Sequence, residues 1–102
     1  MELIIDNTFE KTAHDLGYVS FEEFARKNLK RELQEKIHEY QKIVKSLEAK
    51  YGMDYVEFST RVIDKNDLVL KKFEIFEKED DDFAWQDSID FFQIYSSKLK
   101  SL

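Results

Sequence analysis

Few side chains of this sequence have the type and spacing that acid–base or metal chemistry needs. His14 and His38 are far apart in the chain, and neither has a second metal-ligating side chain four residues further on. Asp80, Asp81 and Asp82 form a run of carboxylates, but it lacks the spaced ligands and the glycine of a calcium loop. The chain has no Cys and no glycine-rich phosphate loop. We therefore expect no enzyme, no metal site and no cofactor.

The remaining candidate residues favour binding to another protein. The C-terminal half combines acidic with aromatic side chains, and aromatic side chains dominate binding hot spots. A helix of this composition suits a groove on a basic partner. The same aromatic residues would also serve to pack against a long helix of this chain, and that alternative stays open. The candidate partner-binding residues are Asp80, Asp81, Asp82, Trp85, Ile89, Phe91, Phe92 and Tyr95.

The stretch from Ser20 to Tyr51 predicts the long helix that must position these residues. It contains no Gly and no Pro, Ser20 and Glu23 have the spacing of a capping box, and Gly52 follows where helices commonly end. A helix of about 31 residues is roughly 46 Å long, so its apolar seam must be covered by other segments, a second copy or a different partner. The seam follows the heptad steps of a coiled coil, through Leu33, Ile37, Tyr40, Val44, Leu47 and Tyr51.

Shorter elements are predicted on both sides of this helix. The apolar spacing favours a helix from about Leu3 to Leu16, ended by Gly17, although residues 1–6 would also suit a short strand. Asp54 begins a second capping box, which predicts a short helix at residues 54–63. Residues 64–67 have the composition of a loop.

The C-terminal elements are harder to delimit. Residues 68–76 fit a helix face, although part of the stretch alternates like a strand, and we favour the helix. A last helix is expected from Asp82 or Phe83 to Lys100. Residues 80–82 would form its cap and first turn, because like charges resist burial and the helix macrodipole favours anions there.

Composition agrees with one helical domain. The 102 residues include no Pro and only two Gly, and 15% of them are aromatic. We predict an all-α, elongated helical hairpin or coiled-coil-like protein over residues 1–102, with one long central helix at about 20–51. Its parts are an N-terminal helix and turn at 1–19, the long helix, the short helix and a partner-binding half at 67–102. No apolar run approaches a membrane span, and we expect a cytoplasmic protein without membrane contact.

The charge is unevenly distributed. The chain carries a net charge of −6, yet residues 20–51 carry eight basic and six acidic residues, and residues 54–102 carry seven basic and twelve acidic residues. The acidic half suits docking on a basic protein, or else solvated helix faces. A basic collar near the start of the long helix is the candidate nucleic-acid contact, formed by Arg26, Lys27, Lys30 and Arg31.

The stretch from Phe9 to Leu29 resembles a known two-helix unit. Its features are two helical patterns joined by a glycine turn, carried by Ala13, Leu16, Gly17, Tyr18, Ser20, Glu23, Phe24, Arg26 and Leu29. They resemble the two-helix part of ribbon-helix-helix proteins, a family in which two such helices interlock in a dimer and a preceding basic strand reads DNA. Residues 1–8 contain no Lys or Arg.

A second set of motifs extends from Leu29 to Leu102. It comprises a helix ending in Lys-Tyr-Gly-Met, a Glu-Phe pair, an acidic linker, a Trp and terminal leucines, here Lys50–Met53, Glu57, Phe58, Glu77–Asp82, Trp85, Leu99 and Leu102. This pattern resembles small prokaryotic antitoxins from the toxin–antitoxin modules of archaea and cyanobacteria. The resemblance implies a protein that binds and neutralises a cognate small toxin, often an RNA-cleaving one, through its C-terminal half.

Two other functions remain open on the sequence. The seam alone would suit a homodimeric coiled-coil scaffold without an inhibitory role. The glycine hairpin would suit a ribbon-helix-helix-like DNA-binding regulator. The expected partners are accordingly a cognate toxin protein in a hetero-oligomer, a second copy in a homodimer, or, less favoured, nucleic acid.

Overall fold

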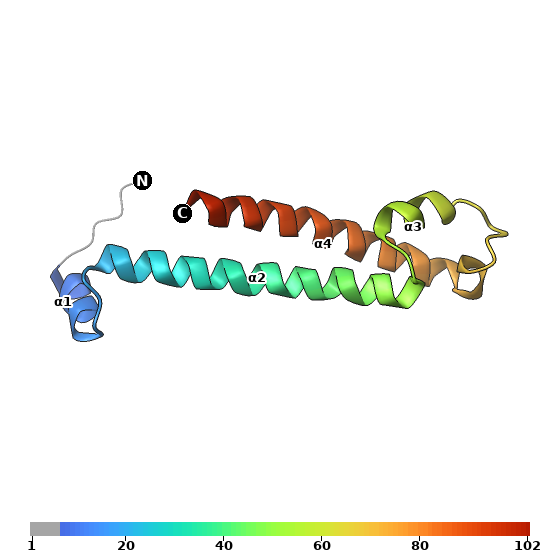
Figure 1. The fold of residues 1–102 in the computed structure, drawn as a ribbon. Helices are drawn as coiled ribbons and strands as arrows, with labels where there is room; N and C mark the ends of the chain where they lie inside the picture. The colour runs from blue at the N-terminus through green and yellow to red at the C-terminus, as the bar shows by residue number, and fades with distance from the viewer. Residues whose placement is uncertain (1–6) are drawn as a thin grey trace.

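The computed structural model describes residues 7–102, and these residues form an elongated all-α molecule. The helices are α1 (Asn7–Asp15), α2 (Phe21–Tyr51), α3 (Tyr55–Arg61) and α4 (Ile75–Ser101), with a turn of 3₁₀ helix, η1, at Leu70–Lys72. Figure 1 shows α2 and α4 as an antiparallel hairpin, with α1 at its open end and α3 at its closed end. The molecule measures 66 × 27 × 22 Å. The predicted fold class is confirmed, whereas the predictions for residues 1–6 lie outside the described part.

The caps of α2 lie where the sequence predicts them. The hydroxyl of Ser20 accepts a hydrogen bond from the backbone N–H of Glu23 at 3.0 Å. The carboxylate of Glu23 accepts from the N–H of Val19, one residue before the cap. At the other end Gly52 has a φ of +69° and donates its N–H to the carbonyl of Glu48 at 2.8 Å. A left-handed residue at this position suits glycine, so both ends of α2 are fixed locally.

The start of α4 corrects the sequence prediction. The helix begins at Ile75 and not at residue 82 or 83, and residues 68–76 are divided among a turn, η1 and the first residues of α4. Asp67 stabilises the turn, because its Oδ1 accepts from the N–H groups of Val69 and Leu70, each at 3.0 Å. Phe73 is extended, with φ −100° and ψ 146°, and separates the two helical pieces.

Residues 80–82 therefore lie inside a helix and not at its cap. Successive side chains on an α-helix point about 100° apart, so three adjacent carboxylates need not share one face. Asp80 is exposed, Asp81 contacts α2 and Asp82 contacts Tyr55. The repulsion that favoured a terminal position is relieved because each carboxylate has a different environment.

The core lies at the closed end of the hairpin. α3 folds back there over α2 and α4, and the side chains of Phe58, Leu70 and Trp85 are fully buried. Further along, the ring of Tyr40 stacks with Phe91 and Tyr95, with centroids 5.3 and 5.9 Å apart. The heptad seam of α2 is thus covered by α4 of the same chain, so it does not need a second copy to cover it.

α1 packs on the first turns of α2 at the open end. Ala13 is buried, and the rings of Phe9 and Phe21 have centroids 5.3 Å apart. Gly17, with a φ of +94°, makes the predicted turn between the two helices. α1 ends at Asp15, and Leu16 remains largely exposed. No described helix has the length and apolar character needed to cross a membrane.

Candidate protein-binding surface

A polar cluster joins α2, α3 and α4 at the closed end of the hairpin. The Nζ of Lys50 lies 2.8 Å from Glu77 and 2.6 Å from Asp81. The hydroxyl of Tyr51 donates to the same Asp81 carboxylate at 2.5 Å, and the hydroxyl of Tyr55 donates to Asp82 at 2.6 Å. We call these six residues the hinge network: Lys50, Tyr51, Tyr55, Glu77, Asp81 and Asp82.

The hinge network shifts the protonation equilibria of its members. Burial, followed by the hydrogen bond to Asp81, raises the pKa of Tyr51 well above its ordinary value. Burial and the bond to Asp82 raise the pKa of Tyr55 to about 12. The bonds to Asp81 and Glu77 raise the pKa of Lys50. Burial acts to raise the pKa of Asp81, but the bonds from Lys50 and Tyr51 outweigh it and leave that pKa lowered.

These shifts predict that stability falls at both ends of the pH scale. Above the ordinary tyrosine pKa of 10.0, the unfolded chain releases protons that folded Tyr51 and Tyr55 retain, so the free energy of unfolding decreases with rising pH. Below the ordinary aspartate pKa of 3.8, the unfolded chain binds protons that folded Asp81 resists, so stability decreases as pH falls. The Arg61 guanidinium lowers the pKa of Asp67 to about 2, so Asp67 adds to the loss of stability at low pH.

Urea unfolding followed by circular dichroism from about pH 3 to 12 measures this profile. We expect a plateau between about pH 5 and 9. Tyr51→Phe and Tyr55→Phe together should reduce the loss of stability at high pH and leave the part that Lys50 contributes, whereas replacing the half-buried Tyr18, in the turn between α1 and α2, by Phe should not reduce it. If the free energy of unfolding fell equally steeply with rising pH in both variants, the hinge network would not be the cause of the loss of stability at high pH.

The structure directs most of the predicted partner-binding residues toward α2. Trp85 is 0% exposed, so the folded hairpin packs the indole inside the chain and does not present it to a partner. Ile89 packs against the core, Phe92 is half-buried, and Phe91 and Tyr95 stack on Tyr40. These are the contacts within the chain that the sequence left as an alternative. Of the predicted residues, Asp80 is exposed, and Phe91 keeps 39% of its surface exposed.

A different set of side chains lies on the opposite face of α4. Residues seven or eleven positions apart on an α-helix point in nearly the same direction, and Phe76, Phe83 and Ile94 have this spacing. Their exposed fractions are 77%, 71% and 47%. Three exposed aspartates share the face, and none makes an ion pair among residues 7–102. We call this face the outer stripe: Phe76, Asp80, Phe83, Asp87, Asp90 and Ile94.

The sequence contained a signal for the outer stripe that depended on the correct start of α4. Phe76 and Phe83 lie on the same face only if one helix includes both residues. The helix predicted from the sequence begins at residue 82 or 83, whereas α4 begins at Ile75. The buried Trp85 lies about 180° around the helix from Phe76, which separates the core face from the outer stripe. The sequence therefore predicted an acidic and aromatic C-terminal helix but did not single out the residues of the outer stripe.

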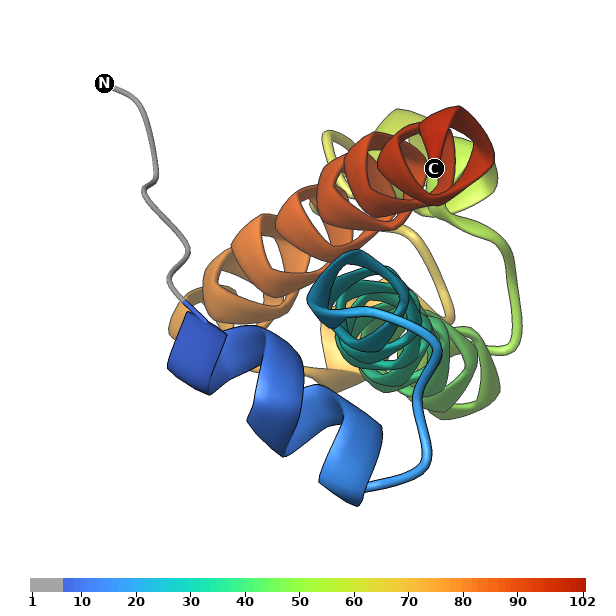
Figure 2. The same cartoon turned by 90° about the vertical axis from the view of Figure 1, so that its left-hand side faces the viewer.

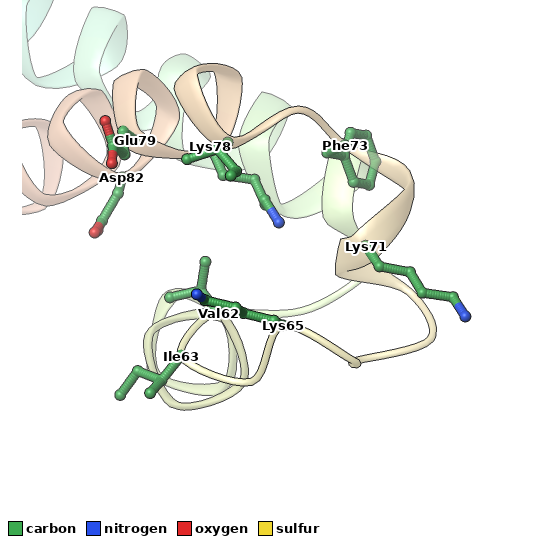
Figure 3. A pocket seen from close by; sticks show the side chains of 9 residues that line it. Val62, Ile63, Lys65, Lys71, Phe73, Lys78, Glu79 and Asp82 are labelled. Atoms are coloured by element: carbon green, nitrogen blue, oxygen red, sulfur yellow. The ribbon is translucent and has the colours of Figure 1, made fainter.

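An open hollow of about 550 Å³ lies beside the start of α4, between the end of α3 and η1. Figure 3 shows Val62 and Lys78 facing each other across it, whereas the side chain of Lys71 extends away. Its lining mixes the ammonium groups of Lys65 and Lys78 with the carboxylates of Glu79 and Asp82. Charges of both signs partly cancel, so the hollow has no strong preference for one small ion.

The predicted nucleic-acid collar does not form one surface. Arg26 forms an ion pair with Glu22 at 3.0 Å, and Lys27 with Glu23 at 3.0 Å. Arg31 donates to the side-chain oxygen of Asn28 at 2.7 Å, and Lys30 is half-buried. Since residues 26 and 31 point about 140° apart around α2, the collar encircles the helix and does not line one face.

The motifs that resemble antitoxins have structural roles at the closed end of the hairpin. Lys50 and Tyr51 belong to the hinge network, Met53 is buried in the core, and Phe58 and Trp85 are fully buried. These residues therefore hold the closed end of the hairpin together. Comparisons of the chain with protein-family models, with curated proteins and with solved structures find no match.

Proposed function

We propose that this protein is an antitoxin-like inhibitor that binds a small basic toxin, of the RNA-cleaving kind, through the outer stripe of α4. The observation that carries the proposal is the exposure of Phe76, Phe83 and Ile94 on one helix face beside unpaired aspartates. Exposed large apolar side chains that cluster on one face typically mark an interaction site.

The size of the apolar contribution indicates which partner fits. Burying one such side chain contributes roughly 1.5–3 kcal/mol, so the three together give roughly 5–9 kcal/mol. Association costs about 4–15 kcal/mol in lost freedom, so the apolar side chains alone leave little surplus. Asp80, Asp87 and Asp90 add attraction to a basic surface and speed the encounter. A basic partner is therefore favoured over a neutral one.

An RNA-cleaving enzyme presents such a basic surface, because its substrate is a polyanion. Carboxylates along a rigid helix would occupy the sites that phosphates use, which explains inhibition by simple competition. The resemblance of the hinge motifs to antitoxins supports the same class. The seam of α2 is already covered by α4, so a scaffold joined through that seam is less well supported.

Co-expression with the product of an adjacent reading frame tests this function. We expect the neighbouring small basic protein to arrest growth when it is expressed alone, and this chain to restore growth and to co-purify with it. The purified chain should also block cleavage of a labelled RNA by the neighbour. A neighbour that is harmless alone, or a toxic neighbour that this chain neither binds nor inhibits, would contradict the proposal.

A further inference from the structure

The face of α2 that points away from α4 carries a continuous row of basic and polar side chains. Along α2 these residues step by 4, 3, 4, 4 and 3, which keeps them on one side of the helix. All six are exposed. We call this row the basic ridge: Lys27, Arg31, Gln34, His38, Lys42 and Lys45.

The cations of the basic ridge are mostly not neutralised within the molecule. Lys27 pairs with Glu23, but among residues 7–102 no carboxylate forms an ion pair with Arg31, Lys42 or Lys45. Glu35, Glu39 and Glu48 flank the ridge on the same helix, and Glu39 pairs with Lys36 instead. From Lys27 to Lys45 the row runs roughly 27 Å along the helix.

The basic ridge and the acidic outer stripe lie on opposite sides of the hairpin. Figure 2 looks along the hairpin and shows α4 on one side of α2, with α1 beside α2. Two packed helices about 8–10 Å apart, each about 10–12 Å wide, hold their outer faces roughly 20 Å apart. The Debye length at physiological ionic strength is about 8 Å, so the acidic side hardly weakens the field at the ridge.

The composition of the ridge distinguishes among polyanions. A protein interface needs a desolvated apolar centre, and none of the six ridge side chains is apolar. Contacts to a phosphate backbone need only spaced cations and hydrogen-bond donors, which Lys, Arg and Gln provide. Adjacent ridge residues have Cβ atoms about 5–6 Å apart, so several cations can contact one strand together.

We propose that the basic ridge of α2 is a binding site for the phosphate backbone of a nucleic acid, separate from the outer stripe. This site does not depend on the proposed function. It uses residues beyond the collar predicted from the sequence, since His38, Lys42 and Lys45 extend the row past Arg31 and Arg26 does not take part. An RNA or DNA held here would lie across the hairpin from a protein bound to α4.

Fluorescence anisotropy with the full chain tests the site. The probes are a labelled duplex DNA of about 20 base pairs and a labelled single-stranded RNA of about 20 nucleotides, in about 50–200 mM salt. With four lysine or arginine contacts, the logarithm of affinity should fall with the logarithm of salt at a slope of about −3 to −4 for DNA. That slope corresponds to a loss of about 100-fold over this range. Preference for one probe identifies which nucleic acid is bound.

The decisive variant is Arg31→Gln/Lys42→Gln/Lys45→Gln. It should weaken binding by at least about 30-fold at the lowest salt and reduce the slope by about 3. Lys65→Gln/Lys98→Gln/Lys100→Gln changes the net charge equally but away from the ridge, and should bind within about 2-fold of the wild type. Both variants should keep the wild-type circular dichroism spectrum, because all six side chains are exposed.

Three results would overturn the site. They are the absence of binding to either probe at low salt, equal losses in the two triple variants, and tighter binding of polyglutamate than of both probes. The last would assign the ridge to an acidic protein. Phe76→Ala/Phe83→Ala should leave nucleic-acid binding unchanged, so failure of the outer-stripe proposal and failure of the ridge proposal can be told apart.

Discussion

Replacing Trp85 with alanine should lower the free energy of unfolding by about 3–5 kcal/mol. The indole is 0% exposed and lies between three rings, with centroid distances of 5.1 Å to Phe58, 5.4 Å to Tyr55 and 6.0 Å to Tyr51. Each of these rings comes from the region where α2, α3 and α4 meet. Removing the indole leaves a cavity that cannot close without moving a helix, which adds to the lost apolar burial.

This loss is large relative to the total free energy of unfolding. A protein of this size is stable by about 5–15 kcal/mol, so the variant should lose at least about a fifth of the total. Thermal unfolding by circular dichroism should show a midpoint lowered by roughly 15–30 °C. Phe83→Ala removes an aromatic ring from the same helix at a site that is 71% exposed, and it should change stability by less than about 0.5 kcal/mol.

Trp85→Phe separates packing from hydrogen bonding. The indole N–H of Trp85 is buried and has no hydrogen-bond partner in the part of the chain described. A buried donor without an acceptor costs about 1–3 kcal/mol, so losing it offsets part of the lost volume. We therefore expect Trp85→Phe to cost clearly less than Trp85→Ala. If Trp85→Ala were no more destabilising than Phe83→Ala, the core at the hinge would have to be assigned to other residues.

The double variant Phe76→Ala/Phe83→Ala should weaken binding of the proposed basic partner by about 100- to 1,000-fold. The two rings are the most exposed aromatic side chains of α4, at 77% and 71%, and sit on either side of Asp80. Two hot-spot residues, each contributing about 2 kcal/mol, produce an effect of this size. Titration calorimetry with the neighbouring basic protein measures it, and inhibition of RNA cleavage should weaken in parallel.

The chain offers a matched control for this variant. Leu16→Ala/Val19→Ala also removes two exposed apolar side chains, at 64% and 76%, but in the turn between α1 and α2 at the open end of the hairpin, far along the molecule from Phe76 and Phe83. The affinity of this control variant for the basic partner should stay within about 3-fold of that of the wild type. Equal losses in both double variants would show that binding does not depend on the outer stripe in particular. A full-strength complex with Phe76→Ala/Phe83→Ala would remove the outer stripe from the proposal.

The candidate site was only partly predictable from the sequence. The sequence predicted an acidic, aromatic C-terminal helix, and that helix exists. It assigned the contact to residues such as Trp85 and Tyr95, which pack within the hairpin, and it did not single out Phe76, Phe83 and Ile94, which the fold leaves exposed. Aromatic residues on a helix with apolar side chains over more than half its circumference give no local indication of which side faces the core. Only the position of the partner helix decides that.

The sequence by itself determined α2, its caps at Ser20 and Gly52 and its heptad seam, because capping and periodicity act between residues a few positions apart. It also determined the all-α class, through the scarcity of Gly and Pro. Only the tertiary structure decided where α4 begins and which partner covers the seam. The reason is that Lys50 and Tyr51 bond to Asp81 across the hairpin, about thirty residues along the chain, and local spacing cannot encode such a contact.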